Sequence, residues 1–291
     1  MAGKPIVVGT DGSKESLRAV EWAAREAVLR GTPLRIVSAA ELPSRMIRSH
    51  GGSQYDTVSD LLRDNRDRAL SAAAELAGQA ASGLLIDTDQ LAGDPAEAVT
   101  ASGNGALMLV VGSRGRGAFT AMLLGSVSRY AAIHASSPVV VVREETTATH
   151  KQVGVGISDP ETCSAALEFA FEEAALRKAS VIAIHAWHTP EYDISRAGPP
   201  PAGPAADVLE AAASRQLDKL LDGWRKKYPD VPVAQDVVHG HPGRALVGLS
   251  ARADLTVIGR RSARAGVHGP GTVMHAVLNH AHGPIATVPS S

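Results

Sequence analysis

The feature that most constrains the fold of this chain is an internal duplication. When the sequence is slid against itself by 147 residues, residues 22–27 fall on residues 169–174, and Gly112 falls on Gly259. Beyond Gly259 the offset drops to 146, so that Pro138 matches Pro284 and one residue is missing from a glycine-rich loop of the second copy. A repeat of this length indicates two copies of one domain. We predict domains at residues 1–147 and 148–291.

Each copy alternates short apolar runs with longer amphipathic stretches. In the first copy the apolar runs predict strands at residues 6–9, 34–39, 84–90, 107–111 and 138–142. The last two runs are continuously apolar, which is typical of strands buried on both faces of a parallel sheet. Strands that alternate with helices imply right-handed βαβ units. The predicted fold class is therefore α/β, with two tandem doubly wound five-stranded parallel-sheet domains that are Rossmann-like.

Residues at the predicted helix ends support this reading. Ser13 is suited to the N-cap of a helix over residues 13–30, and Gly31 is suited to end it. A second helical stretch covers residues 55–81. Asp94 and Pro95 are suited to the N-cap and the first position of a third helix. A further helix is expected after Gly125.

Composition excludes several classes of function. The formal net charge is −1, so a whole-chain basic surface for nucleic acid is absent. The single cysteine, Cys163, rules out an intrachain disulfide. We found no apolar run that could span a bilayer, no signal-peptide pattern and no tight metal-ligand motif. We therefore expect a cytoplasmic protein with no membrane, nucleic-acid or metal partner site.

Glycines cluster where the fourth predicted strand ends. Gly112 and Gly115 follow that strand, and Gly125-Ser126 opens the next helix. In a doubly wound sheet, ligands bind outside the carboxyl ends of the strands, where the strand order reverses. Glycines there let the backbone approach a phosphate, and amides at a helix N-terminus attract anions. The simpler alternative is that these glycines only form tight turns.

The spacing Gly-x2-Gly-x9-Gly-Ser resembles the ATP-binding signature of the universal stress protein family, and residues 7–13 resemble the opening segment of that family. The resemblance covers almost the whole chain and implies that the Rossmann-like domains are of the adenine nucleotide α-hydrolase-like type. It implies ATP as the cofactor, with or without Mg2+, and an acid after the first strand that lies in the nucleotide site. The nucleotide-binding residues that it implies are Thr10, Asp11, Ala39, Val111, Gly112, Arg114, Gly115, Gly125, Ser126 and Val127.

The second copy departs from this pattern. Ser158 stands at the place of Asp11, the acid is displaced to Asp159, and Ser262 stands at the place of Gly115. These changes predict a second, weaker site, and therefore stronger ATP retention in the first copy. The residues expected in the second site are Gly156, Ser158, Ala186, Gly259, Ser262, Gly271 and Thr272.

The leading functional hypothesis is an ATP-binding regulator, and the resemblance implies a role in stress or dormancy. An ATP hydrolase or nucleotidyl transferase of a related α/β type is the alternative, with Asp11 as its only carboxylate within the motif. A third hypothesis is an interaction scaffold whose pockets are vestigial. Residues 139–142 form an apolar fifth strand that needs covering, so we expect a homodimer or pairing of the two halves through their fifth strands.

Overall fold

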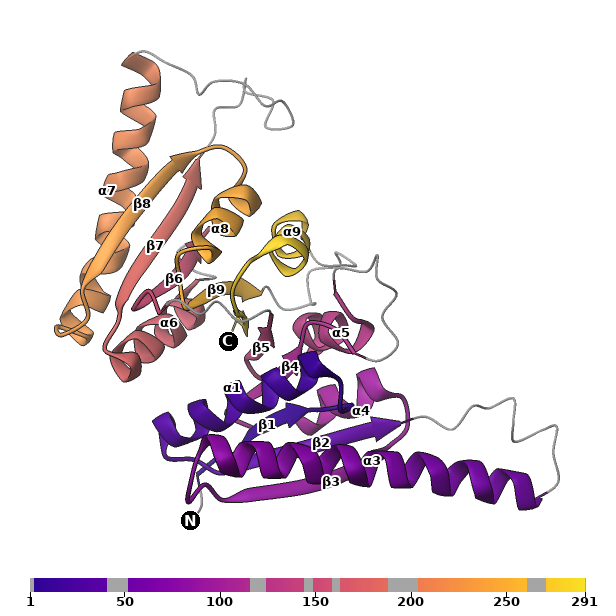
Figure 1. The fold of residues 1–291 in the computed structure, drawn as a ribbon. Helices are drawn as coiled ribbons and strands as arrows, with labels where there is room; N and C mark the ends of the chain where they lie inside the picture. Colours follow the sequence, from indigo (N-terminus) through magenta and orange to yellow (C-terminus); the bar gives the residue numbers. More distant parts are fainter. Residues whose placement is uncertain are drawn as a thin grey trace. The chain divides into compact units, whose positions relative to one another are not determined.

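The computed structural model describes residues 3–40, 52–115, 124–143, 149–158, 163–187, 204–260 and 271–290. The chain divides into two compact units, Met1–Arg143 and Glu144–Ser291, here called the first and the second domain (Figure 1). In this described part, no helix is long and apolar enough to cross a membrane.

The first domain is built on a parallel sheet. Its strands are β1 (Ile6–Gly9), β2 (Leu34–Ala40), β3 (Ile86–Ala92), β4 (Met108–Gly112) and β5 (Val139–Val142). They follow the order β3-β2-β1-β4-β5, with β1 paired to both β2 and β4. The strand order therefore reverses between β1 and β4, the place where ligands bind in open α/β sheets. The predicted five-stranded parallel sheet is confirmed, although β3 begins two residues later than expected.

Helices cover both faces of this sheet. They are α1 (Lys14–Arg30), α3 (Gly52–Ala80), α4 (Pro95–Ser102) and α5 (Ser126–His134). Helix α1 packs with α3, and α4 packs with α5. Gly9 of β1 faces Val99 of α4, whereas Gly112 of β4 faces the start of α1, so the two pairs lie on opposite faces. The domain is doubly wound, as the sequence predicts.

The predicted helix caps are present. The Ser13 hydroxyl accepts a hydrogen bond from the amide of Ser16 at 3.3 Å, and Gly31 ends α1 with a φ of 61°. A carboxylate oxygen of Asp94 accepts from the amides of Ala96 and Glu97 at 2.9 and 3.0 Å. Both side chains satisfy amides that have no partner within the helix.

The second domain repeats this architecture. Its strands are β6 (Gln152–Ile157), β7 (Ser180–Trp187), β8 (Val233–His239), β9 (Leu255–Arg260) and β10 (Ile285–Pro289), in the order β10-β9-β6-β7-β8. Its helices are α6 (Ser164–Arg177), α7 (Pro204–Lys227), α8 (Pro242–Ser250) and α9 (Thr272–His280). The register matches too, because Val8 pairs with Val110 in the first domain and Val155 with Val257 in the second.

The two domains differ in how their first two helices pack. In the first domain, α1 packs with α3, and Ala24 and Ala77 at the positions equivalent to Phe171 and Trp224 are fully buried. In the second, the fully buried Phe171 of α6 stacks on Trp224 of α7, with ring centroids 5.6 Å apart, and lies 5.4 Å from the ring of Tyr228. Large aromatic rings therefore fill the space between these two helices in the second domain, where the first domain has small alanine side chains.

This difference predicts a local effect on stability. Replacing Phe171 by alanine removes a buried ring and leaves a cavity, so we expect a loss of about 3–5 kcal/mol. Urea unfolding followed by tryptophan fluorescence measures this, because Trp224 stacks on the deleted ring. The matched control is Val208→Ala on α7, where the side chain is 64% exposed and the expected change is under about 0.5 kcal/mol. Equal stability of the two variants would contradict the packing role of Phe171.

Candidate functional site

The site of the first domain lies at the carboxyl ends of β1 and β4. Thr10 directly follows β1 and is buried. Its hydroxyl lies 3.1 Å from that of Ser16 and accepts a hydrogen bond from the amide of Gly12 at 3.2 Å. Thr10 therefore connects the loop to the first turn of α1, and its hydroxyl is engaged within the protein.

Asp11 and Gly115 come together although they are far apart in the sequence. One carboxylate oxygen of Asp11 accepts from the amide of Ser13 at 3.0 Å. A Cβ atom added to Gly115 would lie 2.5 Å from the other carboxylate oxygen. Any side chain at position 115 would therefore have to displace the Asp11 carboxylate. The structure thus places the acid of the opening segment directly against the glycine loop.

Gly112 has a packing role that the sequence did not reveal. A Cβ atom at this position would lie 2.7 Å from the carbonyl oxygen of Glu15 and 2.9 Å from the amide nitrogen of Ser16. These are backbone atoms, so the first turn of α1 could not sit against β4 if residue 112 carried a side chain. This contact alone requires glycine at position 112. It does not test the expectation that Gly112 lets a phosphate approach the backbone.

The start of α5 differs from the starts of α1 and α4. Its N-cap is Gly125, which makes no side-chain cap hydrogen bond. Ser126 and Val127 occupy the first turn, where backbone amides have no partner within the helix. A helix N-terminus of this kind favours an anion. Sequence reasoning did not include Ser128 in the site. Its buried hydroxyl donates to the Gly112 carbonyl and links α5 to β4.

The remaining residues expected in the first site are placed differently from one another. Arg114 is half-buried, and its Cα would lie 3.5 Å from a Cβ atom on Gly125. Ala39 is half-buried near the end of β2. Val111 is only 2% exposed, so it packs in the core beneath the site. The structure therefore brings Asp11, Arg114, Gly115 and Gly125 to one edge of the sheet and leaves Val111 inside.

In the second domain, the expected residues have mixed roles. A Cβ atom on Gly156 would lie 3.0 Å from Leu246 of α8, which gives this glycine a packing role. Ser158 follows β6, Ala186 lies half-buried in β7, and Gly259 is exposed in β9. Gly271 caps α9 without a side-chain hydrogen bond, and Thr272 is the first residue of that helix. Asp159 and Ser262 lie outside the described residues.

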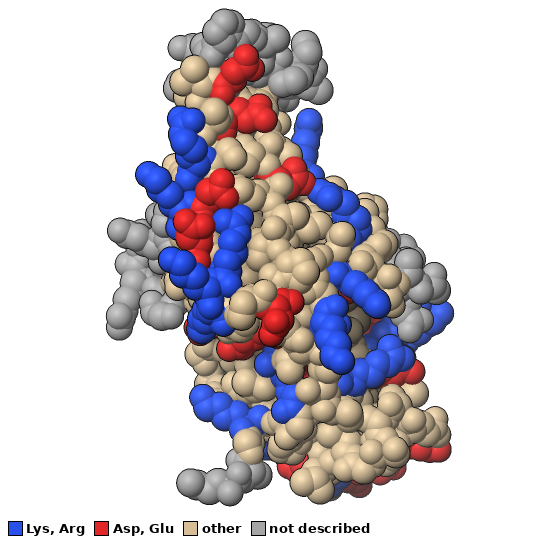
Figure 2. Space-filling model, turned by 90° about the vertical axis from the view of Figure 1, so that its left-hand side faces the viewer, with Lys and Arg blue, Asp and Glu red and all other residues tan. Residues whose placement is uncertain are grey.

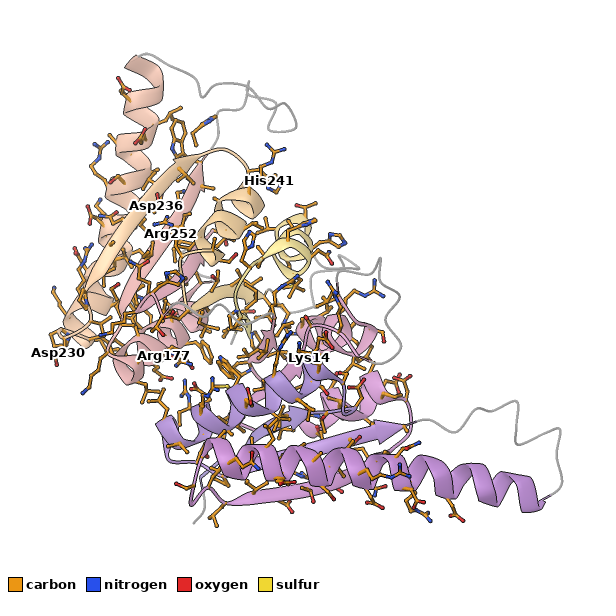
Figure 3. The ribbon with its side chains drawn as sticks, viewed as in Figure 1. Lys14, Arg177, Asp230, Asp236, His241 and Arg252 are labelled. Atoms are coloured by element: carbon orange, nitrogen blue, oxygen red, sulfur yellow. The ribbon has the colours of Figure 1, made fainter. Side chains whose placement is uncertain are left out.

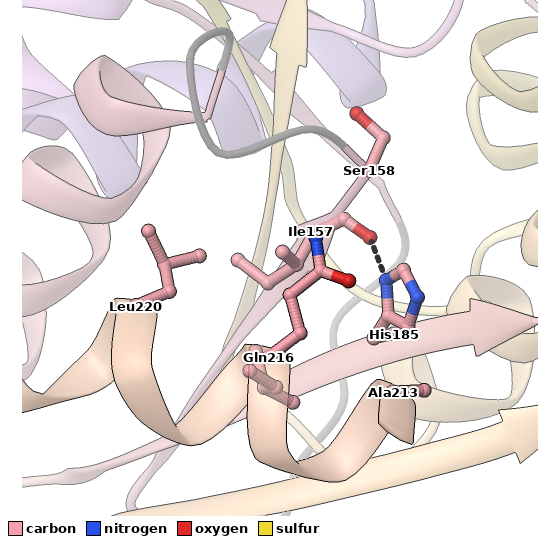
Figure 4. Close-up of a pocket in the computed structure, with 7 residues that line it drawn as sticks. Ile157, Ser158, His185, Ala213, Gln216 and Leu220 are labelled. Atoms are coloured by element: carbon pink, nitrogen blue, oxygen red, sulfur yellow. Dashed lines mark hydrogen bonds between the residues drawn. The ribbon is translucent and has the colours of Figure 1, made fainter. Parts of the chain in front are cut away.

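Two further features of the second domain escaped the sequence analysis. Arg260, at the carboxyl end of β9, is only 8% exposed, and this burial lowers the pKa of its guanidinium group. A hollow of about 250 Å3, including its open mouth, lies between the ends of β6 and β7 and helix α7 (Figure 4). It is lined by Ile157, Ser158, His185, Ala213, Gln216, Leu217 and Leu220.

Side chains that bind metal ions do not cluster among the described residues. They contain no group of three or more His, Cys, Asp or Glu side chains that could hold a metal ion. His241 instead caps α8, where its Nδ1 accepts from the amide of Gly243 at 3.0 Å (Figure 3). Basic and acidic side chains are interspersed on the face shown in Figure 2. Lys227 donates to Glu168 at 2.6 Å, and this hydrogen bond raises the pKa of the lysine.

Comparison with known proteins decides the family. The model of the universal stress protein family matches residues 3–143 and again residues 149–289. The chain belongs to the universal stress protein family.

Relatives of the same tandem length share much of this sequence. A universal stress protein of Mycobacterium tuberculosis is 33% identical over 290 residues, which cover 96% of this chain and 95% of that protein. A universal stress protein of Mycolicibacterium smegmatis is 32% identical, with 97% and 96% of the two chains covered. The crystal structure of a universal stress protein from Archaeoglobus fulgidus covers 99% of this chain and 98% of its own, with a TM-score of 0.73 at 18% identity. The last comparison confirms the fold.

The contacts of two glycines in this universal stress protein predict that substitution by alanine lowers stability at one position and leaves it nearly unchanged at the other. Gly112→Ala forces a methyl group against the backbone of Glu15, so we expect a loss of about 1–3 kcal/mol in unfolding free energy. Gly125→Ala meets nothing closer than 3.5 Å and has a φ of −70°, so we expect a change within about 0.5 kcal/mol. Thermal denaturation without nucleotide compares the two variants. A stable Gly112→Ala protein would show that α1 does not need this close approach.

Proposed function

We propose that the first domain binds ATP at the carboxyl ends of β1 and β4, and that the chain acts as a nucleotide-dependent regulator. The observation that carries this proposal is the contact between Asp11 and Gly115, which unites the two halves of the family's nucleotide signature. A side chain at position 115 would displace the carboxylate of a distant loop, so this glycine has a neighbour beyond its own turn.

The groups around this contact suit a nucleotide. The first turn of α5 supplies backbone amides for phosphate oxygens, and its N-cap glycine adds no side chain of its own over them. The backbone of Arg114 lies beside Gly125, and we propose that its side chain adds a positive charge near the phosphates. The Asp11 carboxylate suits either a ribose hydroxyl or Mg2+, which prefers carboxylates together with the phosphates of its substrate. In the second domain Ser158 replaces this carboxylate, and we propose that ATP binds there more weakly.

The regulatory part of the proposal follows from ligand linkage. A bound nucleotide shifts a conformational or assembly equilibrium only as far as its affinities for the two states differ. Membership of the family supports a role in stress or dormancy. We further propose a cytoplasmic location. Pairing through the fifth strands, in a homodimer or between the two halves, stays a prediction. Light scattering of the purified protein with and without ATP would test the homodimer.

The proposal predicts that Gly115→Val weakens ATP binding by at least about tenfold, or about 1.4 kcal/mol. The valine side chain collides with Asp11 and occupies the space above the loop. Isothermal titration calorimetry measures the affinity directly. Thermal denaturation provides a second readout, because ATP at 100 times its Kd stabilises a binding domain by about 2.7 kcal/mol. That stabilisation should disappear in the variant.

The matched control is Gly78→Val in α3, where no atom lies within 4 Å of an added Cβ atom. This variant should bind ATP as the unmodified protein does. Normal ATP binding by Gly115→Val would refute the proposed site. Steady turnover of ATP with Mg2+, abolished in Asp11→Ala, would favour a hydrolase or nucleotidyl transferase over a regulator.

A further inference from the structure

The start of α5 is joined to the end of β4 by two hydrogen bonds. The Gly125 amide donates to the Ser113 carbonyl at 2.8 Å, and the Ser128 hydroxyl donates to the Gly112 carbonyl. Two consecutive carbonyl groups at the end of the strand therefore accept from the beginning of the helix. The Ser128 side chain makes its link inside the protein, because the residue is only 4% exposed.

The first turn of α5 carries backbone amides that have no partner in the helix. The first amide with such a partner is that of Arg129, which donates to the Gly125 carbonyl at 3.0 Å. The amides of residues 126–128 come before it, and amides in this position suit the oxygens of a phosphate. The N-cap makes no side-chain hydrogen bond to them, and the Ser128 hydroxyl donates to β4 instead.

The carbonyl group that Ser128 binds belongs to a tightly packed residue. A Cβ atom on Gly112 would lie 2.7 Å from the Glu15 carbonyl oxygen, so this residue is held directly against the first turn of α1. The N-cap of the same helix, Ser13, donates its amide to the Asp11 carboxylate at 3.0 Å. A single residue of β4 therefore joins the helix start that holds the acid to the helix start that offers the amides, and Ser128 makes the second of these two contacts.

The second domain lacks this hydroxyl. At the offset of 146 residues, Met274 of α9 stands at the place of Ser128. A thioether has no hydrogen to donate, so Met274 cannot bind the Gly259 carbonyl in the same way. Helix α9 does keep the N-cap glycine, Gly271, which makes no side-chain hydrogen bond. The two helices therefore begin alike, but at this position a hydroxyl fixes α5 to its strand and none fixes α9.

We infer that Ser128 is a positioning residue for the phosphate groups of the nucleotide, because its hydrogen bond to Gly112 holds the first-turn amides of α5 in place relative to Asp11. The inference rests on the proposed ATP site of the first domain. Hydrogen bonds weaken steeply when donor and acceptor are misaligned, so a small displacement of α5 weakens the amide–phosphate contacts together. Adenosine has no phosphate, so its binding does not depend on these amides.

The test compares Ser128→Ala with Ser128→Thr in the full chain. Alanine removes the hydroxyl and with it the link to β4, whereas threonine keeps a hydroxyl. Competition against radiolabelled ATP measures the affinities for ATP, tripolyphosphate and adenosine, and the Gly115→Val chain gives the contribution of the second domain, which is subtracted. In Ser128→Ala the affinities for ATP and tripolyphosphate should fall about tenfold, while that for adenosine stays the same. Ser128→Thr should bind ATP as the unmodified protein does.

The matched control is Ser137→Ala. Ser137 belongs to the same domain and is 5% exposed, but it precedes β5 and so lies at the opposite edge of the parallel sheet from the site. This change also removes a buried hydroxyl, so it reports the effect of altered packing alone and should leave the ATP affinity unchanged. Thermal denaturation without nucleotide checks that each variant is folded. If Ser128→Ala does not fold, Ser128→Cys takes its place, because a thiol of similar shape is only a weak donor.

The outcomes separate this inference from the proposed site. An unchanged ATP affinity in the folded alanine or cysteine variant overturns the inference and leaves the ATP site intact. So does an equal loss of affinity for ATP and adenosine, a loss as large in Ser137→Ala, or a folded Ser128→Thr protein that binds ATP as weakly as Ser128→Ala. Absence of ATP binding by the unmodified chain overturns both proposals.

Discussion

The close approach of α1 to the end of β4 is the constraint on which the site of the first domain depends. Glu15 and Ser16 meet β4 at Gly112 with no room for a Cβ atom. This contact positions the first turn of α1, whose Ser13 amide donates to Asp11 and whose Ser16 hydroxyl lies beside Thr10. The acid can therefore lie against Gly115 because a different glycine, three residues earlier, allows the helix to reach the strand.

Duplication has produced two domains with one backbone plan and two sets of local interactions. The strand order and register are shared, but the space between helices and sheet is filled differently. The first domain uses alanines where the second uses Phe171 and Trp224. Such exchanges leave the fold intact because packing requires total volume to be filled, not particular residues. They also allow one copy to keep the complete glycine signature while Ser158 replaces its acid in the other.

Predictions from the sequence succeeded where structure depends on neighbours along the chain. The caps Ser13 and Asp94 and the left-handed Gly31 were recognisable because each acts within a few residues of its own position. The buried strands β4 and β5 were recognisable from continuous apolar runs. The start of β3 was misplaced by two residues, because Leu84 and Leu85 are apolar like a strand but precede the paired segment, and Leu85 is 74% exposed.

The sequence by itself determined the duplication, the parallel α/β architecture and the family signature, because repeats, periodicity and glycine spacing are properties of the linear chain. Tertiary structure alone decided that Asp11 meets Gly115, that Gly112 is required by α1, and that the second domain has a hollow beside Ala213. Those features depend on strand register and on how closely a helix approaches a sheet. Such distances result from the packing of many side chains together, so no local pattern of residues encodes them.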